Sequence, residues 1–273
     1  ESKRTATYQL SPKYLILKKV DVEKYFAKNS DQRKIKDKFN FDIFYQLKNI
    51  FTDEENKKLE KLNKIYRKKI KKATPDALRK EIERLNIDFS WKSSELEGNT
   101  YSLLETEQLI KNQKEAIGRT KEEAIMILNH KKALDYIGSN KTDFQTVSVA
   151  KIENIHSLIV DGLNVTKNLR KTLVGITGTN YKPLDNEFQI REALEKACEK
   201  VNKTENVFEK AVMLILLIAY IQPFVDGNKR TSRLSGNAIL QSFDSCPLSY
   251  RSMDDAEYKK AILLFYEQNN ISY

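Results

Sequence analysis

The chain has 273 residues, of which 40% are hydrophobic and 32% are charged, enough for one sizeable core or for one core with a smaller appended region. Its eight Gly and five Pro exclude collagen-like, linker-rich and low-complexity proteins. The net charge of +10 and the isoelectric point of about 9.3 favour anionic ligands, which makes nucleic acids and nucleotides the first classes to consider.

The positions of the charged residues and cysteines restrict the classes of protein further. Basic and acidic residues alternate along most of the chain, except in the basic run at residues 67–72, where we favour a solvated helix face over a binding patch. Cys198 and Cys246 are too far apart for metal-ligand spacing, which indicates a reducing compartment and argues against a disulfide scaffold or a zinc site. No secretion-signal pattern is visible. The longest apolar run, residues 211–221, is too short to cross a bilayer, so we expect a cytoplasmic protein without a membrane segment.

Helix-start signals recur along the chain. Three of them are capping boxes: Thr52 with Glu55, Ser102 with Glu105, and Thr120 with Glu123. A fourth is Thr74 followed by Pro75, since proline is favoured at the first helical position. The predicted helices cover residues 34–50, 53–72, 75–97, 102–116, 120–138, 148–161, 186–202, 206–221, 228–243 and 253–268. Residues 1–30 show no strong period and receive no assignment.

One segment interrupts this helical pattern. Residues 172–183 contain β-branched side chains, two glycines and a Lys-Pro end, a composition typical of a short extended hairpin. Helices that enclose a single hairpin predict an all-α domain.

A second segment, residues 222–233, has the features of a phosphate-binding turn. An apolar helix ends before Pro223, and Asp226-Gly227 precedes the next predicted helix at Asn228. Asp-Gly permits the left-handed backbone of a tight turn, and glycine lets a ligand approach the backbone closely. The helix that follows directs its free N–H groups and positive dipole end toward the turn, where an anion is favoured.

The charged residues of this segment suit a triphosphate. Arg230 and Arg233 are three residues apart, so they lie on one helix face beside the N-terminus, and two guanidinium groups there match neighbouring phosphates. Asp226 is placed to hold a Mg²⁺ ion that bridges phosphate oxygens, and Phe224 is expected to anchor the loop in the core.

The whole segment, Gln-Pro-Phe-Val-Asp-Gly-Asn-Lys-Arg-Thr-Ser-Arg, resembles the Fic-family signature His-Pro-Phe-x-Asp/Glu-Gly-Asn-Gly/Lys-Arg-x-x-Arg at every position except the first, where Gln222 stands. The resemblance implies the Fic fold, a helical bundle with one short β-hairpin flap, over about residues 120–245. It also implies ATP as a substrate with Mg²⁺ at Asp226. The residues that it assigns to phosphate binding are Gly227, Asn228, Lys229, Arg230 and Arg233. The flap, residues 172–183, is expected to dock the target through Leu173, Val174, Ile176, Thr177, Gly178 and Tyr181.

An upstream motif resembles the inhibitory helix of self-regulated Fic proteins. Ser93-Ser-Glu-Leu-Glu97-Gly98 fits the pattern Ser/Thr-x-x-x-Glu-Gly/Asn. In that family the glutamate pairs with the second arginine of the signature, here Arg233, and takes the place of the γ-phosphate. This pattern is common, and by itself it would indicate an ordinary helix end at the surface. Because the downstream signature is also present, we expect Ser93, Glu97 and Gly98 to be inhibitory.

Gln222 stands where the family has its catalytic histidine. The histidine removes the proton of a Ser, Thr or Tyr hydroxyl that attacks the α-phosphate of ATP, and imidazole suits this role because its pKa lies near neutrality. Glutamine accepts a hydrogen bond but not the proton, so we expect nucleotide binding to remain and turnover to be poor. The sequence leaves open whether this glutamine is natural or engineered. His130 and His156 fall in predicted helices away from the signature, and we expect both to be structural.

We therefore expect an N-terminal helical region (residues 1–100) with the inhibitory helix at about 75–98, and a Fic core (residues 101–273) with the flap and the signature loop. The expected function is transfer of AMP from ATP to a hydroxyl of a target protein, held back by Glu97 and weakened by Gln222. Two alternatives remain: a catalytically dead nucleotide-binding regulatory module, and a Fic protein that removes AMP or moves another phosphate-containing group.

The expected partners follow from the same resemblance. They are the nucleotide and a target protein that carries the acceptor hydroxyl, and self-association is a further option because helical Fic proteins often form oligomers. Nucleic acid is disfavoured, since the chain has no zinc-finger spacing, no RNP-type aromatic motif and no basic-region zipper.

Overall fold

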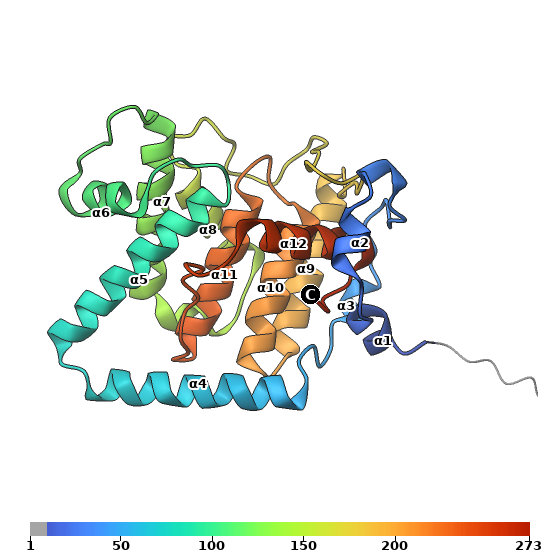
Figure 1. Cartoon of the computed structure of the whole chain (residues 1–273), viewed down its shortest axis with the longest axis horizontal. Coiled ribbons are helices and arrows are strands. Elements are labelled where there is room, and N and C mark those ends of the chain that lie inside the picture. Colours follow the sequence, from blue (N-terminus) through green and yellow to red (C-terminus); the bar gives the residue numbers. More distant parts are fainter. Residues whose placement is uncertain (1–9) are drawn as a thin grey trace, which may run out of the picture.

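The computed structural model describes residues 10–273 and is built from helices (Figure 1). In chain order the helices are α1 (Pro12–Leu17), α2 (Val22–Phe26), η1 (Ser30–Gln32), α3 (Ile43–Gln46), α4 (Asp53–Lys72), α5 (Pro75–Glu95), α6 (Leu103–Asn112), α7 (Lys121–Ser139), η2 (Lys141–Gln145), α8 (Val149–Ile159), α9 (Glu187–Lys203), α10 (Val207–Ile221), α11 (Asn228–Ser242) and α12 (Asp255–Gln268). The all-α prediction is confirmed. None of the helices among the described residues is long and apolar enough to cross a membrane.

The helix starts follow the signals in the sequence. The three capping boxes begin α4, α6 and α7, with the N-cap hydroxyl and the N3 glutamate both bonded to the backbone. Thr74 caps α5 and Pro75 is its first residue. Local side-chain hydrogen bonds thus fix these boundaries before any tertiary contact forms.

The core is organised around α10 and α11, which pack on each other near the centre of Figure 1. Helix α10 is apolar on nearly every side and forms the middle of the main core cluster, covered by α9 and α12. Helix α11 is buried almost throughout although it carries Arg230, Arg233 and Asn237. Buried polar groups are usually hydrogen-bonded, and Arg233 and Asn237 bond to segments outside α11, at Ser93 and Leu248.

Two predictions of secondary structure were wrong. The helix expected over residues 34–50 is reduced to α3, because the backbone before it bonds elsewhere: the Lys182 N–H donates to the Asp37 carbonyl (2.8 Å) and the Lys36 N–H to the Glu267 carbonyl (2.7 Å). The expected hairpin at residues 172–183 is a loop with a turn at Thr177–Gly178 and no strand ladder. Within residues 10–273 the one isolated bridge joins Lys38 and Lys182, so the flap pairs with the N-terminal segment rather than with itself.

The close contact between Gly236 of α11 and Ile215 of α10 gives a test of this packing. A Cβ added to Gly236 would lie 2.5 Å from both Cγ1 and Cδ1 of Ile215, so we expect Gly236→Ala to lower the free energy of unfolding by about 1–2 kcal/mol through overpacking. Gly138 in α7 has open space around it. The matched variant Gly138→Ala should raise stability by about 0.5–1 kcal/mol through helix propensity. Urea denaturation of both variants measures the difference, and stabilisation by Gly236→Ala would contradict the packing.

Candidate functional site

The signature loop, residues 222–233, is fixed by its own backbone and by one asparagine. Gln222 ends α10 in the left-handed conformation (φ 51°), and Gly227 adopts it again (φ 79°) before α11. The Asn228 side chain accepts from the Phe224 N–H and donates to the Phe224 carbonyl, both at 2.8 Å. The side-chain amide of Asn228 therefore closes the loop, and only the backbone N–H of this residue is left for a ligand.

His156 supports the same loop through two contacts. Its ring stacks on Phe224 with centroids 3.6 Å apart, and Nε2 lies 3.0 Å from the Asp226 carbonyl, to which it donates. The prediction that this histidine lies away from the signature is therefore wrong, whereas these contacts are structural, as expected. Seventy residues separate the two partners, and no local pattern reveals such a contact.

The start of α11 has the character of an anion site. No side chain caps its first turn, so the N–H groups there are free for a ligand. Arg230 is 2% exposed; its NH2 group donates to Asp226 (2.6 Å), while NH1 is buried without a hydrogen-bond partner in the described part of the chain. A buried guanidinium nitrogen left unpaired is costly, and a phosphate oxygen would satisfy it.

Asp226 carries the one carboxylate at this turn. Its side chain is 61% exposed and pairs with Arg230. Among residues 10–273 no cluster of three His, Cys, Asp or Glu side chains is arranged to hold a metal. A single exposed carboxylate fits Mg²⁺, which proteins bind through one or two carboxylates together with substrate phosphates, and it does not fit an ion caged by protein alone.

Arg233 joins α11 to α5. It is fully buried; Nε donates to Ser93 Oγ (2.9 Å), and NH2 donates to the Ser93 carbonyl (2.8 Å) and to Glu97 Oε1 (2.9 Å). NH1 points to the Tyr258 hydroxyl at 3.3 Å. The structure thus brings Ser93 and Glu97 onto the second arginine of the signature.

Glu97 has a second cation beside it. Its Oε2 accepts from Lys229 Nζ at 2.9 Å, while Oε1 faces Arg233. Burial alone would raise the pKa of Glu97, but the positive charges of Arg233 and Lys229 outweigh it and hold the pKa below the usual value. The carboxylate is therefore ionised at neutral pH, and its single negative charge is shared between the two cations. Gly98 follows in a left-handed conformation (φ 95°) that ends the helix.

His130 holds Ser93 in place. Its Nδ1 lies 2.8 Å from the Met126 carbonyl, which only accepts, so Nδ1 carries the proton. Nε2 then accepts from the Ser93 hydroxyl (2.9 Å), which in turn accepts from Arg233. Like His156, this histidine lies next to the site, contrary to the sequence prediction.

The side chain of Gln222 is 7% exposed and faces inward. Its amide nitrogen donates to the Ala219 carbonyl (2.6 Å) and lies 3.3 Å from the Tyr266 hydroxyl. Burial raises the pKa of Tyr266 well above its usual value, so this tyrosine keeps its proton and is no base. Neither residue in this contact takes up a proton at neutral pH.

The flap is tied to the signature loop by Arg170, which the sequence analysis did not assign to the site. Its Nε donates to the Gln222 carbonyl (2.6 Å), and its two terminal nitrogens donate to the carbonyls of Thr172 and Leu184, one at each end of the flap. The six predicted docking residues differ in exposure: Leu173, Thr177 and Gly178 are exposed, Val174 and Ile176 are half-buried, and Tyr181 is buried.

Comparisons with known proteins give matches to Fic proteins. Residues 146–240 match the model of the Fic/DOC family. The chain is 26% identical over 185 residues to the protein adenylyltransferase Fic of Nematostella vectensis (66% of this chain, 43% of the relative), and 28% identical over 174 residues to the one of Aedes aegypti (60% and 34%). It therefore spans less than half the length of these curated relatives.

Solved structures show the same fold. A Fic domain containing signaling protein from Bacteroides thetaiotaomicron superposes with a TM-score of 0.64 at 19% identity, over 74% of this chain and 79% of that one. Fic-1 from C. elegans (residues 134–508) gives a TM-score of 0.61 at 19% identity, over 77% and 65%. The match of residues 146–240 to the Fic/DOC family model, together with the shared fold, confirms the resemblance seen in the sequence.

The buried histidines predict a dependence of stability on pH. Burial lowers the pKa of His130 to about 3, whereas an unfolded histidine titrates near 6.5. Because the pKa is lower in the folded state, the neutral histidine makes its full contribution to the free energy of unfolding above pH 6.5. This contribution is lost as the pH falls toward 3. At pH 5, His130 alone should cost the protein about 2 kcal/mol relative to pH 7.5.

Urea denaturation at pH 7.5 and at pH 5 measures this loss, and His130→Gln is the matched variant because its amide keeps a hydrogen-bonding group near Ser93. We expect the loss between the two pH values to shrink by about 2 kcal/mol in His130→Gln. An unchanged loss would show that His130 does not titrate as its burial requires.

Proposed function

We propose that this chain is a Fic-type protein adenylyltransferase that binds ATP with Mg²⁺ at the signature loop, is inhibited by Glu97, and transfers AMP poorly because Gln222 replaces the catalytic histidine. The observation that carries the proposal is Arg230, which is buried at the uncapped start of α11 and has one guanidinium nitrogen without a partner among residues 10–273. The names of the curated relatives, protein adenylyltransferases, support the same reaction class.

In the proposed reaction the oxygen of a target hydroxyl attacks the α-phosphorus of ATP. The bond to the β-phosphate breaks, pyrophosphate leaves, and the hydroxyl proton passes to a base. Arg230 and the N–H groups at the start of α11 hold and neutralise the phosphates, which is the main protein contribution in such chemistry. Mg²⁺ at Asp226 would neutralise phosphate charge when bound.

The missing part is the base. A glutamine amide accepts a hydrogen bond from the hydroxyl but does not take its proton, and the loss of a general base slows such reactions by about 10²–10⁴. Tyr266, the hydroxyl nearest to Gln222 in the hydrogen-bond network, stays protonated. Binding should therefore persist while turnover is weak.

Inhibition by Glu97 follows from competition for one guanidinium group. A phosphate oxygen and the Glu97 carboxylate both require the NH2 donor of Arg233, and charge-assisted bonds to that donor are strong. Lys229 adds a second ion pair to the same carboxylate. Displacing Glu97 thus costs two ion pairs rather than one.

A second function is favoured by the inward position of Gln222. Because its amide is satisfied within the core, the residue stabilises the loop rather than facing an incoming hydroxyl. In that alternative the chain is a nucleotide-binding regulatory module without chemistry, in which ATP displaces Glu97 and moves the inhibitory helix.

Two substitutions in combination distinguish these functions. Four proteins are compared with Mg-ATP: the chain itself, Glu97→Gly, Gln222→His, and the double variant. We expect AMP adducts, seen by intact mass on the protein or on added lysate proteins, to be strong only in the double variant and at least about tenfold weaker in the others.

The control is Arg230→Ala in the double variant, which should bind and transfer far less although circular dichroism shows it folded. Adducts that persist in this control would mean that the signature loop is not the reactive site. If no protein of the set acquires AMP while all bind ATP, the regulatory module becomes the better account.

A further inference from the structure

Helix α4 and the first half of α5 form an arm with almost no core of its own. Figure 1 shows α4 along the lower edge of the molecule and α5 returning from its end toward α7. Over residues 53–86 the only buried residue is Asn63. Helices of this length owe most of their stability to packing of an apolar face, so an arm of 34 residues that buries one asparagine lacks its usual support.

Polar bonds, not apolar packing, attach the arm to the body. Asn63 donates to Ser245 Oγ and accepts from the Cys246 N–H, both at 3.1 Å. Arg67 donates to the carbonyls of Asp244 (2.9 Å) and Phe243 (2.7 Å). These bonds hold α4 at one line of contact and leave open space on either side of it.

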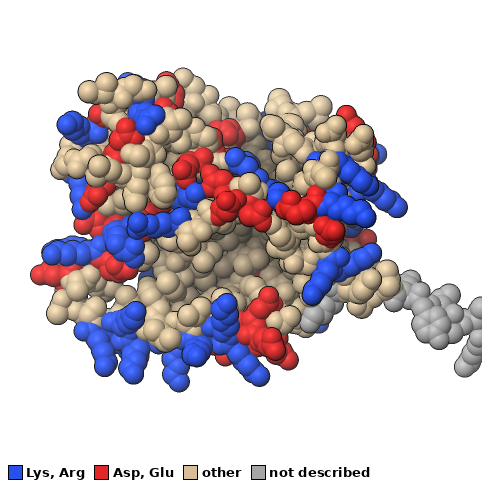
Figure 2. Space-filling view, viewed as in Figure 1, with Lys and Arg blue, Asp and Glu red and all other residues tan. Residues whose placement is uncertain are grey.

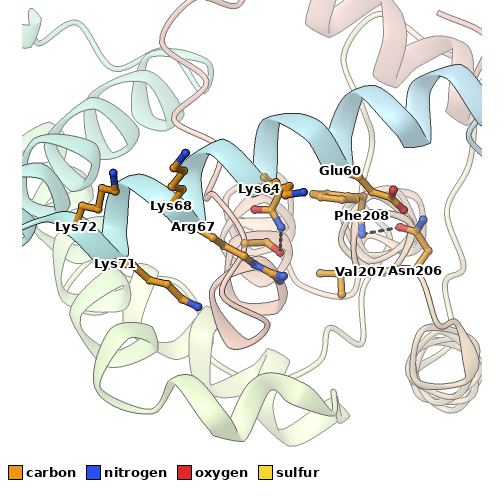
Figure 3. A pocket seen from close by; sticks show the side chains of 11 residues that line it. Glu60, Lys64, Arg67, Lys68, Lys71, Lys72, Asn206, Val207 and Phe208 are labelled. Atoms are coloured by element: carbon orange, nitrogen blue, oxygen red, sulfur yellow. Dashed lines mark hydrogen bonds between the residues drawn. The ribbon is translucent and has the colours of Figure 1, made fainter.

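Two hollows lie along this line, of about 780 Å³ and about 900 Å³. Arg67, Lys71 and Ser245 line both of them, so the hollows are neighbouring parts of one groove, here called the arm groove. Figure 3 shows the first part between α4 and the start of α10, with Arg67 and Lys71 extending from α4 toward the body.

The arm groove combines a basic rim with a lining that is largely aliphatic and also includes Glu60, Asp135 and Asp244. The rim belongs to residues 61–72, which contain seven Lys or Arg and no Asp or Glu; Figure 2 shows these side chains along the lower edge, where α4 runs. Five of them line the first hollow, and none forms an ion pair with a described side chain. The aliphatic residues that line the second hollow are Ile70, Leu78, Ile82, Leu85 and Leu134.

We propose that the arm groove binds an acidic amphipathic helix of a partner protein. Such a helix places its apolar stripe on the aliphatic lining and its carboxylates on the unpaired rim of α4, the helix-in-groove mode of recognition. The opposite charges would speed association and orient the helix. The proposal does not depend on the nucleotide chemistry of the signature loop.

Nucleic acid fits the arm groove less well. Its phosphates would use the basic rim, but single strands need aromatic side chains on which bases stack, and the lining offers mainly aliphatic ones. The exposed Ile82, 48% accessible, and the half-buried Leu78 and Leu85 give an apolar helix face a hydrophobic gain of about 25 cal/mol per Å² buried, which a phosphate backbone cannot use.

The test uses a fluorescein-labelled synthetic helix of 18 residues, with Leu at every third or fourth position and Glu on the opposite face. Fluorescence anisotropy with the full chain should show saturable binding. The variant Lys64→Gln/Lys68→Gln/Lys71→Gln should weaken it at least tenfold, since glutamine removes the rim charge but retains helix propensity. The variant Ile70→Ser/Ile82→Ser should weaken binding at least fivefold, because it removes apolar contacts from the lining of the groove.

The matched control is Lys19→Gln/Lys28→Gln/Lys114→Gln, which removes the same charge from exposed lysines elsewhere and should leave binding within twofold. The proposal is overturned if this control weakens binding as much, or if a peptide with Ser in place of Leu binds equally well. It is also overturned if a DNA or RNA oligonucleotide binds the groove more tightly than the peptide, or if the groove proves to hold a second copy of the chain in a dimer that the rim variant dissociates.

Discussion

The arrangement of the site depends on how the buried charge of Arg233 is compensated. A fully buried guanidinium without partners is expensive, and removing one partner of a buried pair typically costs about 3–5 kcal/mol. Ser93 fixes the position of Arg233 through two hydrogen bonds, whereas Glu97 supplies the negative charge. The two tasks are separate, so a phosphate could replace the carboxylate while Ser93 still holds the arginine. In the proposed inhibition, Glu97 could therefore leave Arg233 while α5 remains docked on α11 through Ser93.

Features that depend on residues close together in the sequence could be predicted. Capping boxes and the Thr74-Pro75 pair give the starts of four helices, because these hydrogen bonds form within four residues. The apolar run at residues 211–221 lies in the buried helix α10, as its composition predicts. The signature loop was recognisable because turn, glycine and arginines are contiguous, so that their spacing alone defines an anion site.

Contacts between segments far apart in the sequence could not be predicted. His130 reaches Ser93 across 37 residues and His156 reaches Asp226 across 70, and neither pairing leaves a local pattern. The segment at residues 34–50 has helical periodicity, but backbone bonds to Lys182 and Glu267 keep its first part extended. The basic run at 67–72 has the composition of a solvated helix face, and only the aliphatic lining beside it in space gives it the character of a groove.

The central claim, that Glu97 and the terminal phosphate compete for Arg233, is tested most directly by calorimetric titration of ATP and ADP into the chain and into Glu97→Gly, with Gln222 retained so that turnover does not interfere. The account predicts that Glu97→Gly tightens ATP binding at least tenfold, about 1.4 kcal/mol, and changes ADP binding by less than threefold. Equal gains for both nucleotides, or no gain for ATP, would contradict it.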